Sequence, residues 1–293
     1  MNKLGIFTNF WENNWSFDHK RYIEKASKIG FDILEFQAQP LLDMSKEKMI
    51  EIKKYADDKA IELTYSLGLD KKYDIASENS SVRNSGIDYL KRIFERVALM
   101  DGNAISGVAY EGWGAPDYIV NTKQLMLERS VKSMKKIIKT AEDNGIYYSV
   151  EAVNRFESCL INTAEEALDY VDRVESDHIG VLLDTYHMNI EENNIGDAIR
   201  LAGNKLSAFH TGDNNRRCPG RGHIDFDEVF QALAEVGYKE RIVSEPFVMM
   251  GGEVGRDIKV WRNLEKISEE FLDQEADYLL NYEKEMLKKY NMG

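Results

Sequence analysis

Four side chains of the kinds that bind metal ions follow four consecutive apolar segments in the second half of the chain. These side chains are Glu151, Asp184, His210 and Glu245. Neighbouring members lie about 26 to 35 residues apart, the length of one β-strand together with one helix. If the apolar segments are parallel strands of one sheet, their carboxyl ends meet at one edge, and the four side chains point into one volume.

Three carboxylates and one imidazole in a closed volume could support metal-dependent chemistry. Buried carboxylates repel one another, at a cost of several kcal/mol each, unless a cation balances their charge. A donor set of mostly oxygen with one nitrogen favours Mn²⁺, with Co²⁺ or Mg²⁺ as alternatives. A structural zinc site needs cysteine ligands, and neither Cys159 nor Cys218 has a partner at ligand spacing.

Each of these residues also has an ordinary structural interpretation. An acidic residue after a strand is more often a helix N-cap or a solvated loop charge, and a single histidine such as His210 is often structural. The same coincidence on four consecutive segments is much less frequent. The set as a whole therefore favours a divalent metal site over four unrelated structural roles.

The elements that must position these residues follow a repeating pattern. A run with helical periodicity ends in glycine, and a short run rich in β-branched and aromatic residues begins soon after it. The glycines in this position are Gly30, Gly102, Gly145, Gly203 and Gly237. Glycine is the residue that most readily adopts the left-handed conformation that closes a helix. The third repeat is the weakest, because Lys59 stands where a glycine is expected.

Eight strand–helix units are expected. The strands are predicted near residues 4–8, 32–37, 62–67, 104–109, 146–151, 179–184, 206–210 and 241–245, and the helices near 18–29, 45–59, 83–100, 127–141, 163–175, 194–203 and 226–236. This alternation, without a linker or a G-x-G-x-x-G motif, favours a closed (β/α)8 TIM barrel over an open doubly wound sheet. We expect one domain over residues 1–293. An extra amphipathic helix at about 264–290 either caps the barrel or contacts a neighbouring subunit.

The composition argues against several classes of protein. The chain has 38 basic and 51 acidic residues and a formal net charge of −13, which repels nucleic-acid phosphates and anionic lipid surfaces. No apolar run reaches the roughly 18–20 residues of a membrane-spanning helix, and the first residues lack the apolar core of a secretion signal. Two cysteines form no disulfide framework. We therefore expect a cytoplasmic protein without nucleic-acid or membrane partners.

Long motifs around these residues give the chain a recognisable pattern. They read VEAVNRFES (150–158), INTAEEAL (161–168), LLDTYHMNIEENNIGDAIRLAG (182–203), HTGDNNRRCPGRG (210–222) and EPFVMMGGEVGRDIKVWR (245–262). In these motifs the chain resembles the ketose 3-epimerases, which include the D-tagatose and D-psicose (D-allulose) 3-epimerases, among the sugar-phosphate isomerase/epimerase barrels. With GIFTNFWENNW and KIGFDILEF near the start, the resemblance covers nearly all of residues 4–262.

The resemblance implies a role for each matching position. The implied metal ligands are Glu151, Asp184, His210 and Glu245, of which Glu151 and Glu245 are also the two acid/base residues. The implied substrate contacts are Glu157 and His187 near the sugar carbonyl, Arg216 on the same side, and Trp113 and Phe7 against the rest of the sugar. Some alternatives remain open. Glu157 could be a loop charge, His187 a helix cap, Arg217 or Arg221 could replace Arg216, and the two aromatic residues could belong to the core.

The implied reaction is metal-dependent epimerisation of free ketoses at C3, of the D-fructose/D-psicose, D-tagatose/D-sorbose or L-ribulose/L-xylulose type. The C3 hydrogen is acidic because it lies next to the C2 carbonyl, whose developing negative charge a divalent metal stabilises. One glutamate removes the proton, and the other returns a proton to the opposite face of a cis-enediolate. Unphosphorylated sugars are favoured, because no phosphate-binding glycine loop is present. The family also suggests a homodimer or homotetramer.

The chain departs from the family pattern at positions expected to contact the sugar beyond C3. Phe7 stands where the family usually has tyrosine, SLGLDKK (66–72) replaces a G-x-G-P turn, and EGWGAPDY (111–118) differs from the common S-Y-W-P-I-D-Y form. The preferred ketose is therefore left open.

Three other functions compete with epimerisation. An aldose–ketose isomerase could use the same metal site. A multi-zinc endonuclease of this superfamily would need more histidines than the five present. A sugar-binding protein on the same scaffold would have no use for two opposed bases at a metal.

Overall fold

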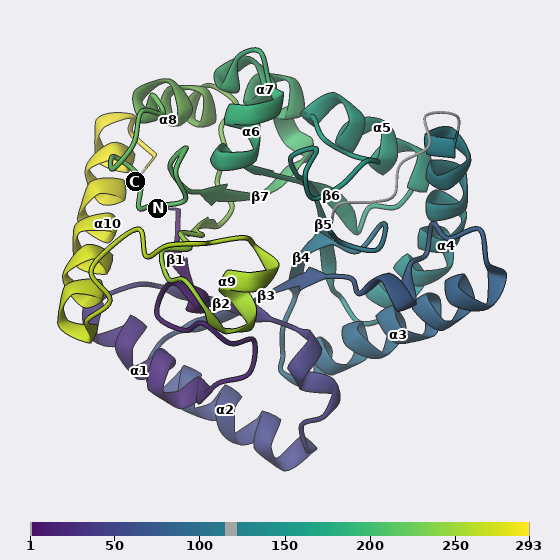
Figure 1. The fold of residues 1–293 in the computed structure, drawn as a ribbon, viewed down its shortest axis with the longest axis horizontal. Helices are drawn as coiled ribbons and strands as arrows, with labels where there is room; N and C mark the ends of the chain where they lie inside the picture. Colours follow the sequence, from purple (N-terminus) through teal and green to yellow (C-terminus); the bar gives the residue numbers. More distant parts are fainter. Residues whose placement is uncertain (1, 115–121, 293) are drawn as a thin grey trace.

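The computed structural model describes residues 2–114 and 122–292. Eight parallel strands close into a barrel in sequence order, and the last strand pairs with the first (Figure 1). The strands are β1 (Leu4–Phe7), β2 (Ile33–Gln37), β3 (Glu62–Gly68), β4 (Ala104–Val108), β5 (Tyr147–Ala152), β6 (Ile179–Asp184), β7 (Leu206–Thr211) and β8 (Ile242–Ser244). The predicted (β/α)8 barrel is confirmed.

Helices surround the barrel (Figure 1). They are α1 (His19–Ile29), α2 (Lys46–Asp58), α3 (Ser80–Leu99), α4 (Lys123–Asp143), α5 (Ala164–Val174), α6 (Thr185–Glu191), α7 (Ile195–Ala202), α8 (Phe226–Glu235), α9 (Gly252–Asp257) and α10 (Glu269–Lys289). The short helices α6 and α9 were not predicted. In the described residues, no helix is long and apolar enough to cross a membrane.

The C-terminal helix α10 belongs to the ring of helices. It packs against α8 on one side and α1 on the other, and so closes the ring next to β8 and β1 (Figure 1). Its apolar face contributes Leu272, Ala276, Leu279 and Leu280 to the core. This helix was predicted at about 264–290, but it starts only at Glu269, where the Ser268 side chain accepts a hydrogen bond from the Phe271 backbone.

Left-handed residues close several helices, but they are not always the expected glycines. Gly30 has a φ of 104° and closes α1 as predicted. After α3 the left-handed residue is Asp101 (φ 52°), so the expectation for Gly102 was wrong. Gly102 is needed for space instead, because a Cβ there would lie 2.6 Å from the Tyr65 ring. In the third repeat Ala60 (φ 55°) takes the left-handed conformation without a glycine.

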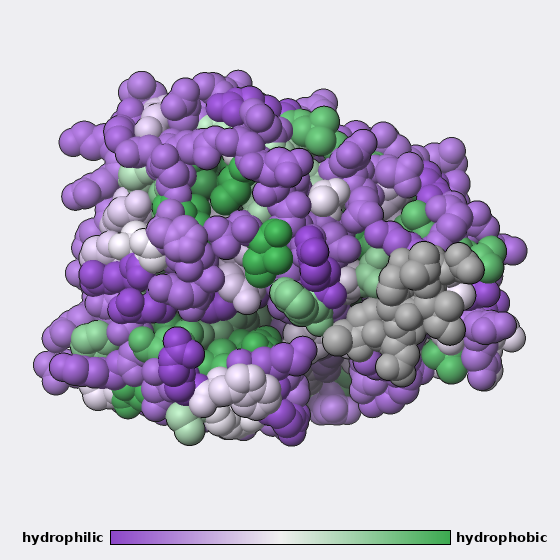
Figure 2. Space-filling view, turned by 45° about the horizontal axis from the view of Figure 1, so that its top comes forward, coloured by the Kyte–Doolittle hydropathy of each residue, from purple (hydrophilic) through white to green (hydrophobic). Residues whose placement is uncertain are grey.

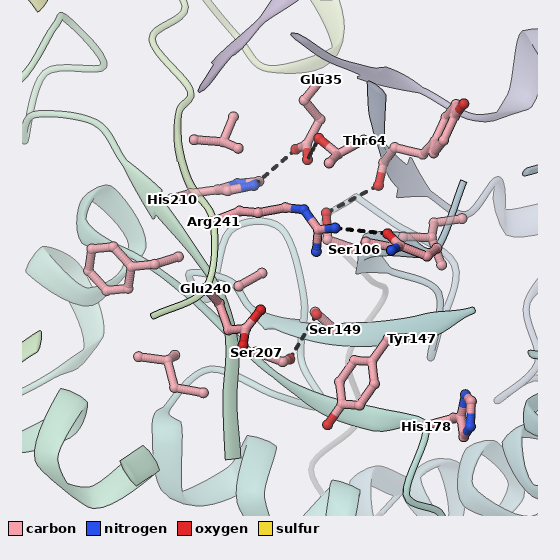
Figure 3. Close-up of a pocket in the computed structure, with 18 of the residues that line it drawn as sticks. Glu35, Thr64, Ser106, Tyr147, Ser149, His178, Ser207, His210, Glu240 and Arg241 are labelled. Carbon is pink, nitrogen blue, oxygen red and sulfur yellow. Dashed lines mark hydrogen bonds and ion pairs between the residues drawn. The ribbon is translucent and has the colours of Figure 1, made fainter. Parts of the chain in front are cut away.

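The barrel interior contains a cavity of about 380 Å³. TIM barrels are normally filled by bulky branched side chains. Here small hydroxyl side chains line much of the space, including Thr64, Ser106, Ser149 and Ser207. Figure 3 shows Ser106, Ser149 and Ser207 below His210 and Thr64 beside Glu35, with Ser149 and Ser207 hydrogen-bonded to each other at 2.8 Å. The cavity extends to Arg241 and Tyr147, near the amino ends of the strands.

A buried carboxylate ties α10 to the barrel. Glu283 is 0 % exposed, and its Oε1 accepts hydrogen bonds from the Thr211 hydroxyl at 2.6 Å and the Ser244 hydroxyl at 2.8 Å. Its Oε2 has no hydrogen-bond partner among the described residues. Burial raises the pKa of Glu283 to about 7, although both hydroxyls oppose this rise.

Glu283 is therefore expected to make the protein less stable at pH 8 than at pH 5. The folded state favours the protonated acid, whereas in the unfolded chain it ionises near its ordinary pKa of 4.5. The free energy of unfolding falls as the pH rises from the pKa of Glu283 in the unfolded chain to its pKa in the folded protein, by on the order of 3 kcal/mol in total. Urea unfolding should show that the free energy of unfolding falls less between pH 5 and pH 8 in Glu283→Gln than in the wild type. The exposed Glu285→Gln on the same helix is the control, and an unchanged loss in Glu283→Gln would contradict this role.

Candidate active site

The four proposed ligand residues meet at the carboxyl end of the barrel. Glu151 lies in β5, Asp184 ends β6, His210 lies in β7, and Glu245 directly follows β8. All four are buried, and one ligand atom from each lies within 4.8 Å of the others. The spacing argument correctly predicted this convergence.

The cluster fits a divalent cation. His210 Nδ1 is buried, has no hydrogen-bond partner among the described residues, and lies 4.0 Å from Glu245 Oε2. Burial and the neighbouring Glu245 raise the pKa of Glu151 well above its usual range, and burial raises that of Glu245 to about 7. These shifts mean that the ionised forms of Glu151 and Glu245 are disfavoured without further positive charge, although Arg216 lowers the pKa of Asp184. A divalent cation would supply that charge.

Asp184 combines the two roles that the sequence left as alternatives. It is the N-cap of α6, and its Oδ1 accepts a hydrogen bond from the Tyr186 backbone at 2.8 Å. Its other oxygen, Oδ2, accepts a hydrogen bond from Arg216 at 2.9 Å. The cap thus fixes the carboxylate that faces the site.

Arg216 is the arginine that enters the site. Its Nη1 donates to Asp184 and also to Glu245 Oε2 at 3.2 Å, and its guanidinium lies 4.0 Å from the centre of the Tyr186 ring. Its backbone is left-handed, with a φ of 60°. The two alternatives bind elsewhere, Arg217 to Glu265 and Arg221 to Glu275.

His187 lies beside the cluster as a neutral imidazole. Its Nδ1 accepts a hydrogen bond from the Asn154 backbone at 3.1 Å. Burial lowers the pKa of His187 to about 4. Nε2 lies 3.6 Å from Glu151 Oε1 and 3.1 Å from Arg216 Nη2, at the edge of the open space above the cluster.

Glu157 and Trp113 form one wall of this space. Glu157 accepts hydrogen bonds from the Asn154 side chain at 3.1 Å and from Trp113 Nε1 at 3.0 Å. The Trp113 ring packs over Gly68, where an added Cβ would lie 3.2 Å from the indole. A larger residue at position 68 would therefore require the indole to shift by a few tenths of an ångström.

The space itself is a cavity of about 1070 Å³ at the barrel mouth. Its lining includes Trp113, Glu151, Glu157, His187, Arg216, Glu245 and Phe247. Phe7 lies one layer behind, fully buried, and its ring packs edge to face on Phe247 at 5.7 Å. Part of the altered stretch 66–72 also lines the cavity. Residues 115–118 of the other altered stretch lie outside the described residues.

Several residues of the site were not identified from the sequence. Phe247 and Asn154 stood within quoted motifs, as EPFV and VNRFE, without an assigned role. Glu35 is the least expected, because it lies within the apolar strand ILEFQ and its Oε1 is 2.9 Å from His210 Nε2. An acidic residue inside a buried strand was the available signal.

The other histidines take no part in the cluster. His19 packs against Phe17 and Phe36, while His178 and His223 contribute no atom to it. Within residues 2–114 and 122–292, no second group of metal-binding side chains is found. A multi-zinc endonuclease centre is therefore not formed by the described residues.

Comparison with known proteins places the chain in a family. Residues 23–264 match the xylose isomerase-like TIM barrel family. The chain is 41% identical over 287 residues to the D-psicose 3-epimerase of Ruminiclostridium cellulolyticum, covering 98% of both chains. It is 39% identical over 283 residues to the D-psicose 3-epimerase of Enterocloster bolteae, covering 96% of this chain and 94% of that one.

A solved structure agrees with this result. The D-psicose 3-epimerase of Clostridium cellulolyticum H10, determined with D-tagatose, superposes with a TM-score of 0.95 and 41% identity, covering 97% of this chain and 99% of that one. The resemblance predicted from the motifs is thereby confirmed. With the barrel, the acid–imidazole cluster and these relatives in agreement, the chain belongs to the ketose 3-epimerase family of xylose isomerase-like TIM barrels.

Proposed function

We propose that this enzyme epimerises free ketoses at C3, with Glu151 and Glu245 as the acid/base pair at a divalent metal site. The observation that carries the proposal is the single buried cluster of three carboxylates and one imidazole below an open cavity. The relatives named as D-psicose 3-epimerases support the choice of C3 and of an unphosphorylated ketose.

The order of the strands supports the two opposed bases. Glu151 and Glu245 come from the outer two of four consecutive strand ends, and Asp184 and His210 come from the two between them. A sugar lying over the middle of the cluster therefore has one glutamate on each side. Inversion needs this arrangement, because the proton leaves one face of C3 and a new proton arrives on the other.

The remaining polar residues orient the sugar and stabilise charge. The Arg216 guanidinium, and His187 when its ring carries the proton on Nε2, can donate hydrogen bonds to the C2 oxygen as negative charge develops there. When bound, the metal supplies Lewis-acid stabilisation of the same charge. We favour Mn²⁺, with Co²⁺ or Mg²⁺ as alternatives, because three carboxylates and one imidazole suit these ions.

The rest of the cavity holds the sugar beyond C3. We assign Trp113 to this wall, and Glu157, which accepts a hydrogen bond from Trp113 Nε1, to the end of the cavity near the sugar carbonyl. Phe7 acts through Phe247, on which it packs. A tyrosine in place of Phe7 would bring a hydroxyl into this fully buried layer, so this position contributes to the choice of ketose.

We also propose a homodimer or homotetramer. Large apolar side chains remain exposed on the segment between β8 and α10, among them Met250 at 49 %, Trp261 at 72 % and Ile267 at 40 %. Figure 2 shows several hydrophobic patches on a largely hydrophilic face of the molecule. Burial of exposed apolar side chains between subunits would be favourable.

Product analysis tests the proposed reaction. The enzyme is incubated with D-fructose, D-tagatose and L-ribulose in the presence of Mn²⁺, and the products are separated by chromatography. We expect the C3 epimer of at least one ketose, with incorporation of solvent deuterium at C3. An aldose product would indicate an aldose–ketose isomerase instead, and the absence of exchange at C3 with all three sugars would contradict the epimerase.

A further inference from the structure

Glu35 lies in β2, next to the metal cluster on the side of the barrel interior. Its carboxylate is buried, 3 % exposed, and its Oε1 lies 2.9 Å from His210 Nε2, close enough to accept a hydrogen bond from a protonated Nε2. Figure 3 shows this contact at the top of the barrel cavity. The contact leaves the other ring nitrogen, Nδ1, facing the three carboxylates of the cluster.

The Glu35 carboxylate is itself held in place. Its Oε2 accepts a hydrogen bond from the Thr64 hydroxyl at 2.7 Å, and its backbone carbonyl accepts one from the Thr8 hydroxyl at 2.8 Å. In the described part of the chain, Glu35 forms no ion pair other than the one with His210. Its charge is therefore directed at this one imidazole.

The imidazole ring of His210 lies beside open space in the barrel interior. The cavity of about 380 Å³ lies directly behind it, and its lining joins Glu35, Thr64, Ser106 and His210. A bulky side chain in this layer would hold the ring by contact, as in most barrels of this type. Because hydroxyls and open space take that place, the carboxylate is the group that can set the ring orientation.

We propose that Glu35 is a positioning residue for the metal centre. It orients the His210 ring and keeps the proton on Nε2, so that the lone pair of Nδ1 faces the cation. A metal-binding histidine commonly donates its other N–H to a carboxylate, and loss of such a partner lowers metal affinity about 10–100-fold. This inference rests on the proposed metal site and adds a residue from β2 that does not touch the cation.

Titration of the metal-free protein with Mn²⁺ by calorimetry tests this role directly. We expect Glu35→Ala to weaken Mn²⁺ binding about 10–100-fold. Glu35→Gln should lie between Glu35→Ala and the wild type, because its amide oxygen can still accept from Nε2. Ser106→Ala is the matched control, since it lines the same cavity but donates only to the Tyr65 carbonyl at 3.3 Å, and its affinity should match the wild type.

The outcomes separate this inference from the proposed function. If the wild type binds Mn²⁺ and Glu35→Ala binds it equally tightly, Glu35 does not position the metal, while the epimerase assignment stands. If the wild type binds no divalent metal, the proposed metal site itself is wrong. Should Glu35→Ala fail to fold, the Thr64→Val variant tests the same role of Glu35. It removes the hydroxyl that holds Oε2 and should weaken Mn²⁺ binding less than Glu35→Ala but more than Ser106→Ala; wild-type affinity in Thr64→Val would then overturn the inference.

Discussion

Replacement of either Glu151 or Glu245 by glutamine is expected to reduce epimerisation by about 10⁴-fold, the upper range for loss of a general acid or base. Each variant keeps one glutamate, which can remove a proton from its own face of C3 and return one to the same face. Each variant should therefore exchange the C3 hydrogen of one epimer with solvent without inverting it. The two variants should act on opposite epimers.

Incubation of both epimers in D₂O, followed by mass spectrometry and chromatography, measures exchange and inversion separately. Mn²⁺ affinity is determined for each variant, because both glutamates also belong to the metal cluster. Glu128→Gln, on the exposed surface of α4, is the control for the same chemical change and should keep full activity. Exchange of the same epimer by both variants, or inversion at the wild-type rate by either, would rule out two opposed bases.

Removal of the metal is the second change with a large expected effect. Lewis-acid stabilisation of the developing oxyanion is worth several kcal/mol, so we expect chelation to lower epimerisation by about 10³-fold or more. Added Mn²⁺ should restore the activity. Comparison of Mn²⁺, Co²⁺ and Mg²⁺ in the same assay identifies the preferred ion.

Asp184→Asn makes this test specific to the cluster. The amide can still cap α6 through its oxygen, but its NH₂ group would face Arg216, and one negative charge is lost from the site. We expect this variant to remain folded and to stay inactive at Mn²⁺ concentrations that fully restore the chelated wild type. Full activity of a wild type shown to be free of metal would contradict a metal-dependent reaction.

The metal cluster could be predicted from the sequence because parallel strands turn regular spacing into proximity. Glu151, Asp184, His210 and Glu245 each follow an apolar run, and the closed barrel brings such positions to one mouth. The same rule says nothing about Glu35. It lies in β2, and its contact with His210 in β7 depends on the small side chains within the barrel, which the spacing of motifs does not reveal.

Local backbone geometry explains two further limits of sequence reasoning. The choice among Arg216, Arg217 and Arg221 was open because all three lie in one loop. The structure separates them through the left-handed backbone at Arg216 and the ion pairs that the other two form with Glu265 and Glu275. The glycine rule was wrong after α3, where Asp101 adopts the left-handed conformation and the next residue must be small to fit beside an aromatic ring.

A crystal structure of the protein with Mn²⁺ and a bound ketose would test the central claim most directly. We expect one Mn²⁺ ion bonded to the four cluster residues, with the carboxylates of Glu151 and Glu245 on opposite sides of the sugar at C3. A metal bound elsewhere, or both glutamates on the same side of C3, would contradict inversion by two bases at this site.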